Sequence, residues 1–541
     1  MKDPERVLDE LRLLFEQHRY DQVQERLKKV RSYPDLSREE KIQFLLLDAE
    51  ISFSRGDRRL PEIVEELTAQ LTADINDETR TEILHTIGNA KRVLGHFSEA
   101  TDFLQEALIL ARKDADPTVA IDILNALASV HGQQSQWAEL HKAATEALKL
   151  AHASKYAAGY SSALITIATS ERARGFHEIA LEHYEHASQL LHEIENSSAL
   201  GLVLNNMADL EITRGDLASG MYLLQQALFQ WQTLGRAEKA AVALTQMGRI
   251  STIKGNLQEA KELLAAAIDS IAHSQAYNPL ILVHALWSLA DIESRSGQFE
   301  QALKLVNQAT TIFEKLEISG LDLGFIWGKT ARLFLDMRRT SEAQAALEKS
   351  EKICSSIEYQ EGIVNCISLR GVLEMQKGNL GIAQQYLEQA RKNSEEGEFF
   401  EVLIQTELSL ADLYLRKLMI DYEASHRKSA TDCLIRASTL VESKSLEHGK
   451  LEAKMLEAVA YSINMRFEEA LEVLERVKNK AHSLELRVIE EEASKRKEGI
   501  RTQMRRIRSQ LPKYPDEEMV SEVMDYISKA QAFLRNSLKQ T

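Results

Sequence analysis

The sequence has few of the residues that interrupt helices or build disulfide frameworks. Its 541 residues include three cysteines (Cys354, Cys366 and Cys433), seven prolines and 23 glycines. So few cysteines, without short paired spacing, exclude a disulfide scaffold and a cysteine-based zinc site, and they favour a reducing compartment. Because most of the prolines stand between periodic apolar segments, the chain is predicted to be nearly all α-helical.

The sequence also lacks a long apolar run and an excess of positive charge. No stretch approaches the roughly 20 apolar residues of a membrane-spanning helix. The N-terminal segment MKDPERVLDELRLLFEQ carries charges where a signal peptide would be apolar. We therefore expect a cytoplasmic protein without membrane insertion. A formal net charge of -16 opposes contact with phosphate backbones, so we expect no nucleic-acid partner.

What the sequence does contain is a repeat of about forty residues along almost its whole length. The first helix of each unit carries a small residue, such as Gly88 or Gly248, and a glycine turn follows seven residues later in six units. One column of the second helix holds Val23, Ile63, Ala100, Leu140, Ala180, Gly220, Ala260, Ala302, Ala343, Ala383, Ala430 and Ala470. This period predicts a solenoid in which each unit buries its apolar face only against its neighbours.

The order of small residue, glycine turn, apolar residue, alanine, leucine and alanine resembles the tetratricopeptide repeat (TPR). Examples are RVLGHFSEATDFLQEAL and TIKGNLQEAKELLAAAI. The long period is similar to that of kinesin light chains, Leu-Gly-Asn repeat proteins and the regulatory domains of maltose-type activators. Over roughly residues 5 to 480, the resemblance implies an all-α, right-handed superhelical α-solenoid of about twelve antiparallel helix pairs. It also implies an adaptor or scaffold, in a family that has many different partners.

Three breaks in the period mark possible specialisation, and one of them is the unit around Ile63, which is three residues short. The column pattern stops near residue 480, so we expect a repeat array over residues 1–480 and a C-terminal helical cap over 481–541. The cap is predicted as one helix over Ala481–Gln510 and an amphipathic helix over Glu517–Leu538. A seven-residue insertion near Lys417–Ala424 is predicted as a loop between two helices, which either contacts a partner or is merely tolerated.

The cap carries a basic cluster in an otherwise acidic protein. Such a patch suits an acidic peptide, a phosphate or the acidic array of a second copy, so a homo-oligomer through the terminal repeats stays open. The alternative is a solvated cap without a partner. The cluster consists of Lys495, Arg496, Lys497, Arg501, Arg505, Arg506 and Arg508.

The concave face is the main candidate site, because the TPR resemblance implies that ligands contact the first helix of each pair. Positions around the small residue share one side of that helix and are rich in amides, arginine and aspartate. Amides pair with peptide groups, arginine binds carboxylates, and tryptophan offers a large contact surface. Ordinary polar exposure with inter-repeat hydrogen bonds is the alternative. The predicted groove residues are Asn89, Arg92, Asn125, Arg172, Asn205, Asn206, Asp209, Arg249, Trp287, Asp291 and Arg332.

No combination of residues predicts catalysis. Gly328-Lys329-Thr330 lacks the upstream glycine of a phosphate-binding loop and lies in a predicted helix. His183 and His186 share a helical face but have no convincing third ligand. We therefore expect a non-enzymatic scaffold, without cofactor or metal, that binds a peptide or helix of a partner protein in the concave groove. The alternative is a ligand- or peptide-responsive regulatory protein that changes superhelical shape on binding.

Overall fold

The computed structural model describes residues 4–16, 19–31, 36–55, 59–72, 75–272, 279–315, 321–444 and 446–510. Within these ranges the chain forms 25 helices and no strand. None of the helices described is long and apolar enough to cross a membrane. The helix expected over Glu517–Leu538 lies outside the described residues.

The helices form twelve antiparallel pairs, which confirms the expected superhelical solenoid. The first helices are α1 (Pro4–Glu16), α3 (Arg38–Arg55), α5 (Asp77–Val93), α7 (Thr118–Gln133), α9 (Ala157–Ala173), α11 (Ser197–Arg214), α13 (Ala237–Lys254), α15 (Pro279–Arg295), α17 (Leu321–Asp336), α19 (Gln360–Gln376), α21 (Phe400–Asp421) and α23 (Glu447–Ile463). The second helices are α2 (Tyr20–Arg31), α4 (Leu60–Thr68), α6 (Phe97–Ala111), α8 (Trp137–Ser154), α10 (His177–Glu193), α12 (Leu217–Thr233), α14 (Leu257–Ala272), α16 (Phe299–Lys315), α18 (Thr340–Ser356), α20 (Leu380–Glu396), α22 (Ala424–Ser443) and α24 (Phe467–Ser483). The last helix, α25 (Arg487–Gln510), packs on α24 and α23.

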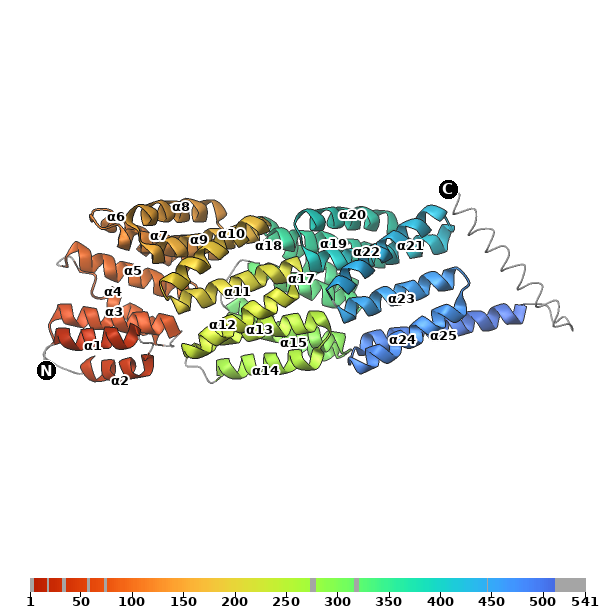
Figure 1. Ribbon diagram of the computed structural model, residues 1–541, viewed down its shortest axis with the longest axis horizontal. Coiled ribbons are helices and arrows are strands. Elements are labelled where there is room, and N and C mark those ends of the chain that lie inside the picture. The colour runs from red at the N-terminus through yellow and green to blue at the C-terminus, as the bar shows by residue number, and fades with distance from the viewer. Residues whose placement is uncertain are drawn as a thin grey trace.

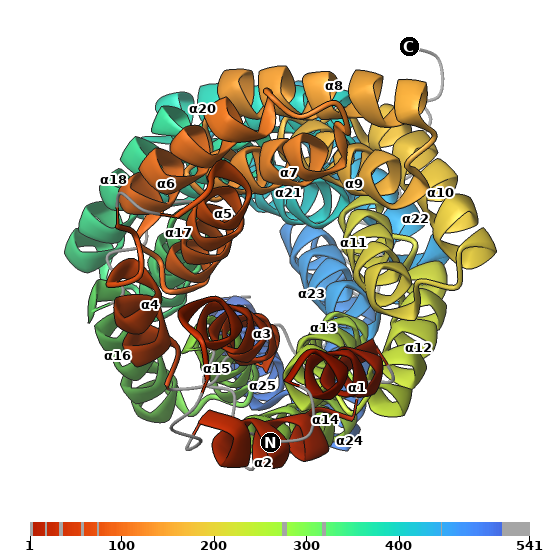
Figure 2. The ribbon, with the colours of Figure 1, turned by 90° about the vertical axis from the view of Figure 1, so that its left-hand side faces the viewer.

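The pairs coil along the long axis of the molecule (Figure 1). Viewed along that axis, the first helices of the pairs lie on the inside of the coil and the second helices on the outside (Figure 2). The small residues let the two helices of a pair approach closely: a Cβ atom on Gly88 or on Gly371 would lie 2.6 Å from Leu104 Cγ or Leu387 Cγ. The predicted glycine turns are also confirmed, with positive φ at Gly95, Gly175, Gly215, Gly255, Gly297 and Gly378.

Two boundaries differ from the sequence expectation. The insertion near Lys417–Ala424 does not form a loop, because it lengthens α21 to 22 residues and α22 to 20 residues. Tyr422, with φ 54°, makes the turn without glycine. The single helix expected over Ala481–Gln510 is also wrong, since α24 runs to Ser483 and α25 begins at Arg487.

The superhelix returns against itself after five helix pairs, as α11 contacts α21 and α13 contacts α23. At these places, the short connection between the two helices of an earlier pair packs on the first residues of a later inner helix. A Cβ atom added to Gly175 would lie 3.5 Å from Phe399, and one added to Gly215 would lie 2.4 Å from Phe400. A Cβ atom added to Gly255 would lie 3.5 Å from Glu447, and one added to Gly297 would lie 3.8 Å from Arg487. We call this row of contacts the inter-turn seam.

Polar and aromatic contacts also cross the seam. Trp137 Nε1 donates a hydrogen bond to the carbonyl oxygen of Ile357 at 2.5 Å. Arg214 pairs with Glu398 at 2.9 Å. One continuous apolar core joins α11–α13 to α19–α23. The expectation that each unit packs only on its neighbours is therefore wrong in this part of the molecule, because closure of the coil brings distant repeats together.

Candidate functional site in the lumen

The inner helices enclose a cavity inside the coil. It has two adjoining lobes of about 280 and 270 Å³. One lobe is lined from α9 to α21, and the other extends to α23 and α25. Both lobes share Arg249, Trp287, Phe325, Lys329 and Glu401, so we treat them as one site, the lumen cavity.

Five charged side chains of alternating sign cross this cavity. Arg172 lies 2.7 Å from Asp209, which lies 3.6 Å from Arg249. Glu401 lies 3.3 Å from Arg249 and 3.1 Å from Lys329. The five side chains are 19 to 28% exposed, so their charges are largely withdrawn from solvent. We call this series the charge chain; it joins helices α9, α11, α13, α21 and α17.

The charge chain keeps Glu401 and Arg249 ionised despite burial. Burial opposes the charge of Glu401, but Lys329 and Arg249 hold the pKa of that carboxyl well below its usual range. Burial likewise opposes the charge of Arg249, while Glu401 and Asp209 raise its pKa.

Glu361 is the exception among the carboxylates of this lobe. Its Oε2 accepts a hydrogen bond from the Tyr359 hydroxyl at 3.1 Å, and no ion pair to Glu361 occurs among the described residues. Burial raises the pKa of Glu361; Arg249 opposes this rise, and Asp209 and Glu401 add to it. Glu361 is therefore more easily protonated than an ordinary glutamate.

In the second lobe, each ion pair joins two residues of the same helix. Asp291 lies 3.1 Å from Arg295, and Asp336 lies 3.0 Å from Arg332. On α23, Glu452 lies 3.5 Å from His448. Against the effect of burial, His448 and the two arginines lower the pKa of Glu452 to about 2.

Four side chains that line the cavity each carry a buried polar atom with no hydrogen-bond partner among the described residues: Trp287 Nε1, Gln246 Oε1, Arg172 Nε and Glu452 Oε2. Trp287 is only 8% exposed, and its ring packs edge-on against Phe325 at 5.7 Å between centroids. Each such unpaired buried group destabilises a protein by about 1–3 kcal/mol. Outside the ion pairs of Arg172 and Glu452, Trp287 Nε1 is a donor and Gln246 Oε1 an acceptor, which together match the two polar groups of a peptide bond.

The structure brings six of the predicted groove residues together in the lumen cavity. These are Arg172, Asp209, Arg249, Trp287, Asp291 and Arg332. The arginines already have carboxylate partners within the chain, so any ligand carboxylate has to compete with them. Trp287 is buried in the wall, where the sequence suggested an open contact surface.

The other five predicted groove residues do not line the lumen cavity. Asn89 and Arg92 lie on α5, toward the N-terminal end of the coil. Asn125 Nδ2 donates to the Gly159 carbonyl oxygen at 3.0 Å, which is an inter-repeat hydrogen bond. Asn205 is buried on α11 with its Oδ1 unpaired, and Asn206 is half-buried beside it.

Sequence reasoning missed Tyr359, Glu361 and Glu401, and it considered Lys329 only as part of a false phosphate loop. Glu361 and Glu401 each lie ten residues before the small residue of their helix, Gly371 and Ala411. His448 occupies the same place before Ala458. A recurring polar residue in the first turn of three successive inner helices was therefore the available signal.

The C-terminal basic cluster lies on α25. Arg501, Arg505 and Arg506 are exposed, and the side chain of Arg508 lies outside the described residues. Part of the cluster is neutralised locally, since Arg505 lies 3.4 Å from Glu498 and Arg496 lies 2.9 Å from Glu492. The lining of the lumen cavity does not include Arg496, Arg501, Arg505 or Arg506.

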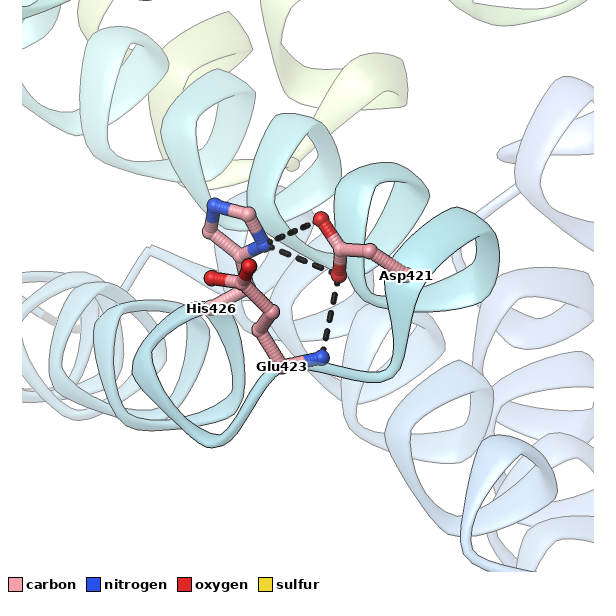
Figure 3. A group of neighbouring side chains, drawn as sticks. All are labelled: Asp421, Glu423 and His426. Carbon is pink, nitrogen blue, oxygen red and sulfur yellow. Dashed lines mark hydrogen bonds and ion pairs between the residues drawn. The ribbon is translucent and has the colours of Figure 1, made fainter.

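In the described ranges, one group of three side chains has the spacing of metal ligands: Asp421, Glu423 and His426, where α21 meets α22 (Figure 3). Their contacts are those of a helix start. Asp421 accepts hydrogen bonds from the Glu423 N–H at 3.0 Å and from His426 Nδ1 at 3.1 Å. Both acids are exposed. His183, the earlier candidate, instead pairs with Glu171 at 2.7 Å.

Comparison with known families shows which family the chain belongs to. The model of the MalT-like TPR region matches residues 182–484, which is more than half of the 541 residues. The chain belongs to the MalT-like TPR family. The MalT-like TPR match runs from α10 to α24 and so includes most of the helices around the lumen cavity. The suspected long-repeat TPR type is thereby confirmed.

Two solved structures are similar to parts of this chain. A Rap protein complexed with competence and sporulation factor has a TM-score of 0.51 and 14% identity, covering 66% of this chain and 99% of that one. NprR in complex with its cognate peptide NprX has a TM-score of 0.45 and 15% identity, covering 65% and 100%. At 14% identity, the likeness to the Rap protein shows the fold alone. No curated protein matches the sequence.

Proposed function

We propose that this MalT-like TPR protein is a non-enzymatic interaction protein that binds a peptide segment of a partner protein in the lumen cavity. The observation that carries the proposal is that the cavity wall contains a residue with an unpaired donor, Trp287, and a residue with an unpaired acceptor, Gln246. A peptide backbone supplies a carbonyl oxygen and an N–H group, so its entry removes the penalty of both orphan atoms.

The shape and composition of the cavity support the same ligand class. Lobes of about 280 and 270 Å³ are close to the smaller ligand pockets of proteins, and together they form an elongated site. The Rap protein, which shares the helical architecture, is named in complex with competence and sporulation factor. A groove already formed by rigid helix pairs leaves most of the ordering cost to the peptide.

The test is selection of peptides from a random-sequence display library by the intact chain and by two lumen variants. Trp287→Phe keeps the ring but removes the N–H donor, and Gln246→Leu removes the acceptor. Trp327→Phe is the matched control, because Trp327 lies on α17 but outside the cavity, with Lys349 Nζ 3.9 Å from its ring centroid. We expect the peptides enriched by the intact chain to be lost by the lumen variants and kept by the control. Equal enrichment by all four proteins would contradict lumen binding.

A second candidate function is a regulatory one, in which binding changes superhelical shape. The inter-turn seam favours it, because contacts between turns give the coil a defined closed state from which it can depart. Solution scattering of the intact chain with and without a selected peptide measures this directly. A change in the maximum dimension supports the switch, whereas identical scattering profiles support a passive scaffold.

A further inference from the structure

The first turn of α21 connects the inter-turn seam to the lumen cavity. Phe399 is 3% exposed and packs against Gly175 and edge-on against His177, with ring centroids 5.5 Å apart. Phe400 is 8% exposed and packs against Gly215. The next residue, Glu401, directs its carboxylate into the charge chain. Three consecutive residues therefore make contacts in both the inter-turn seam and the lumen cavity.

Glu401 occupies a position that suits any carboxylate. It lies between two cations from different helices, Arg249 on α13 and Lys329 on α17. Among the described residues, Glu401 is the single carboxylate that pairs with Lys329. The charge chain has three cations and two carboxylates, so removal of Glu401 leaves Asp209 as its one carboxylate, with Glu361 nearby in the same cavity.

We propose that Glu401 is an internal stand-in for a carboxylate of the bound peptide, and that its displacement from Arg249 and Lys329 releases Phe399 and Phe400 from the seam. The inference rests on the proposed function, because the competing carboxylate belongs to the peptide. That carboxylate comes either from an acidic side chain or from a free C-terminus. The chain is then autoinhibited at its own binding site, and occupancy is coupled to the contact between turns.

The binding test uses three defined peptide pools of random flanking sequence with capped ends and Glu, Gln or Lys fixed at the centre. A fourth pool has Gln at the centre and a free C-terminal carboxylate. Each pool is passed over the immobilised full chain, and the retained peptides are quantified by mass spectrometry. We expect the intact chain to retain the Glu pool or the free-carboxylate pool over the capped Gln pool, which identifies the source of the anion.

Two variants separate the roles of the groups. Glu401→Gln vacates the anion position and is expected to raise retention of the carboxylate pool by about tenfold, the change that about 1.4 kcal/mol produces. Lys329→Met is expected to abolish the preference for carboxylate. Glu388→Gln is the control, because Glu388 on α20 accepts a hydrogen bond from Tyr414 outside the cavity. Circular dichroism checks folding, and Glu401→Asp, which keeps the charge but shortens its reach, replaces Glu401→Gln if the latter unfolds.

The coupling test is hydrogen exchange in the first turn of α21 and in the turn at Gly215. The Glu401→Gln variant, and the intact chain with the preferred pool, are expected to exchange faster at both places. An unchanged carboxylate preference in Glu401→Gln, or unchanged exchange at the seam, overturns the inference. If peptides are retained without charge preference but are lost by Trp287→Phe, the proposed function stands alone. If no peptide is retained, both fail.

Discussion

Helices α1–α6 and helices α11–α25 are built from the same repeat but bury their apolar residues in different ways. In the N-terminal region, each core cluster draws only on successive helices, such as α3, α4 and α5. In the later region, a single cluster joins α11–α13 to α19–α23, and another joins α14 and α15 to α23–α25. The repeat specifies the helix pair, while contacts between turns arise only where a second turn lies against the first.

Buried charged residues also differ between the N-terminal helices and the helices around the lumen cavity. Arg92 on α5 and Arg172 on α9 occupy the same place in their repeats. Burial lowers the pKa of Arg92, and with Arg92 it lowers the pKa of His85 to about 4. Arg172 instead meets Asp209 at 2.7 Å in the lumen cavity. Equivalent residues therefore acquire different roles once the coil has closed around them.

The largest effect is expected from Phe400→Ala, which removes the aromatic anchor of the seam. Loss of a buried phenylalanine destabilises proteins by about 3–5 kcal/mol. We expect a lower unfolding midpoint and a larger maximum dimension in solution scattering. Phe229→Ala on α12 is the control, since Phe229 is 66% exposed and its loss should change stability by less than about 0.5 kcal/mol. Equal effects of the two changes would refute the seam as a stabilising contact.

The next effect separates backbone strain from contact between turns. Gly215 and Gly378 have φ of 80° and 87°, so alanine at either position costs about 1–2 kcal/mol. A Cβ atom on Gly378 meets nothing within 4 Å, whereas one on Gly215 lies 2.4 Å from Phe400. We expect Gly215→Ala to lose a further ~1–3 kcal/mol in chemical unfolding. If the two variants lose the same free energy of unfolding, the seam accommodates a Cβ atom at Gly215 without cost.

Two lumen carboxylates should respond to pH with opposite signs. The pKa of Glu401 in the fold is below its ordinary value of 4.5, so its stabilisation is complete at pH 7, declines as the pH falls below about 4.5, and is lost through the folded pKa. Glu401→Gln should therefore destabilise the protein by about 1–3 kcal/mol at pH 7, and by less in acid. Unfolding by urea at pH 7, 5 and 4 measures the difference.

Glu361→Gln is the counterpart on the neighbouring helix α19. The pKa of Glu361 is raised in the fold, so its ionised form destabilises the protein at pH 7 and protonation relieves that effect. We expect the variant to be as stable as the intact chain, or more stable by less than about 1 kcal/mol. Destabilisation at pH 7 as large as that of Glu401→Gln would show that Glu361 has an ion partner.

The smallest effect is expected from Asn125→Ala on α7, which directly follows the region of local packing. The side chain donates one hydrogen bond to Gly159 in the next inner helix, so its loss should cost about 0.5–1.5 kcal/mol. Hydrogen exchange should rise in α7 and α9 and stay unchanged in α21. Faster exchange at Phe400 would mean that local and inter-turn packing are coupled, contrary to the comparison.

Local periodicity explains which features the sequence predicted. The small residue at Gly88 and the turn at Gly215 are encoded within one repeat, so helix pairs, turns and the inner face follow from spacing alone. The seam does not, because Trp137 and Ile357 bond across 220 residues and no local pattern marks either one. The lumen pairs were partly predicted: Arg249 and Asp209 came from the repeat position, whereas Glu401 joined them only through closure of the coil.

The register of the seam limits how this molecule can vary in length. A solenoid with contacts only between neighbours tolerates the gain or loss of a repeat, since every new interface resembles the old ones. Here α11 lies against α21 and α13 against α23, ten helices apart in each case. One extra repeat between them would set Phe400 against the turn of a different pair and withdraw Glu401 from Arg249. The number of repeats between one turn of the superhelix and the next is thus constrained by the seam, as a core residue is constrained by its packing.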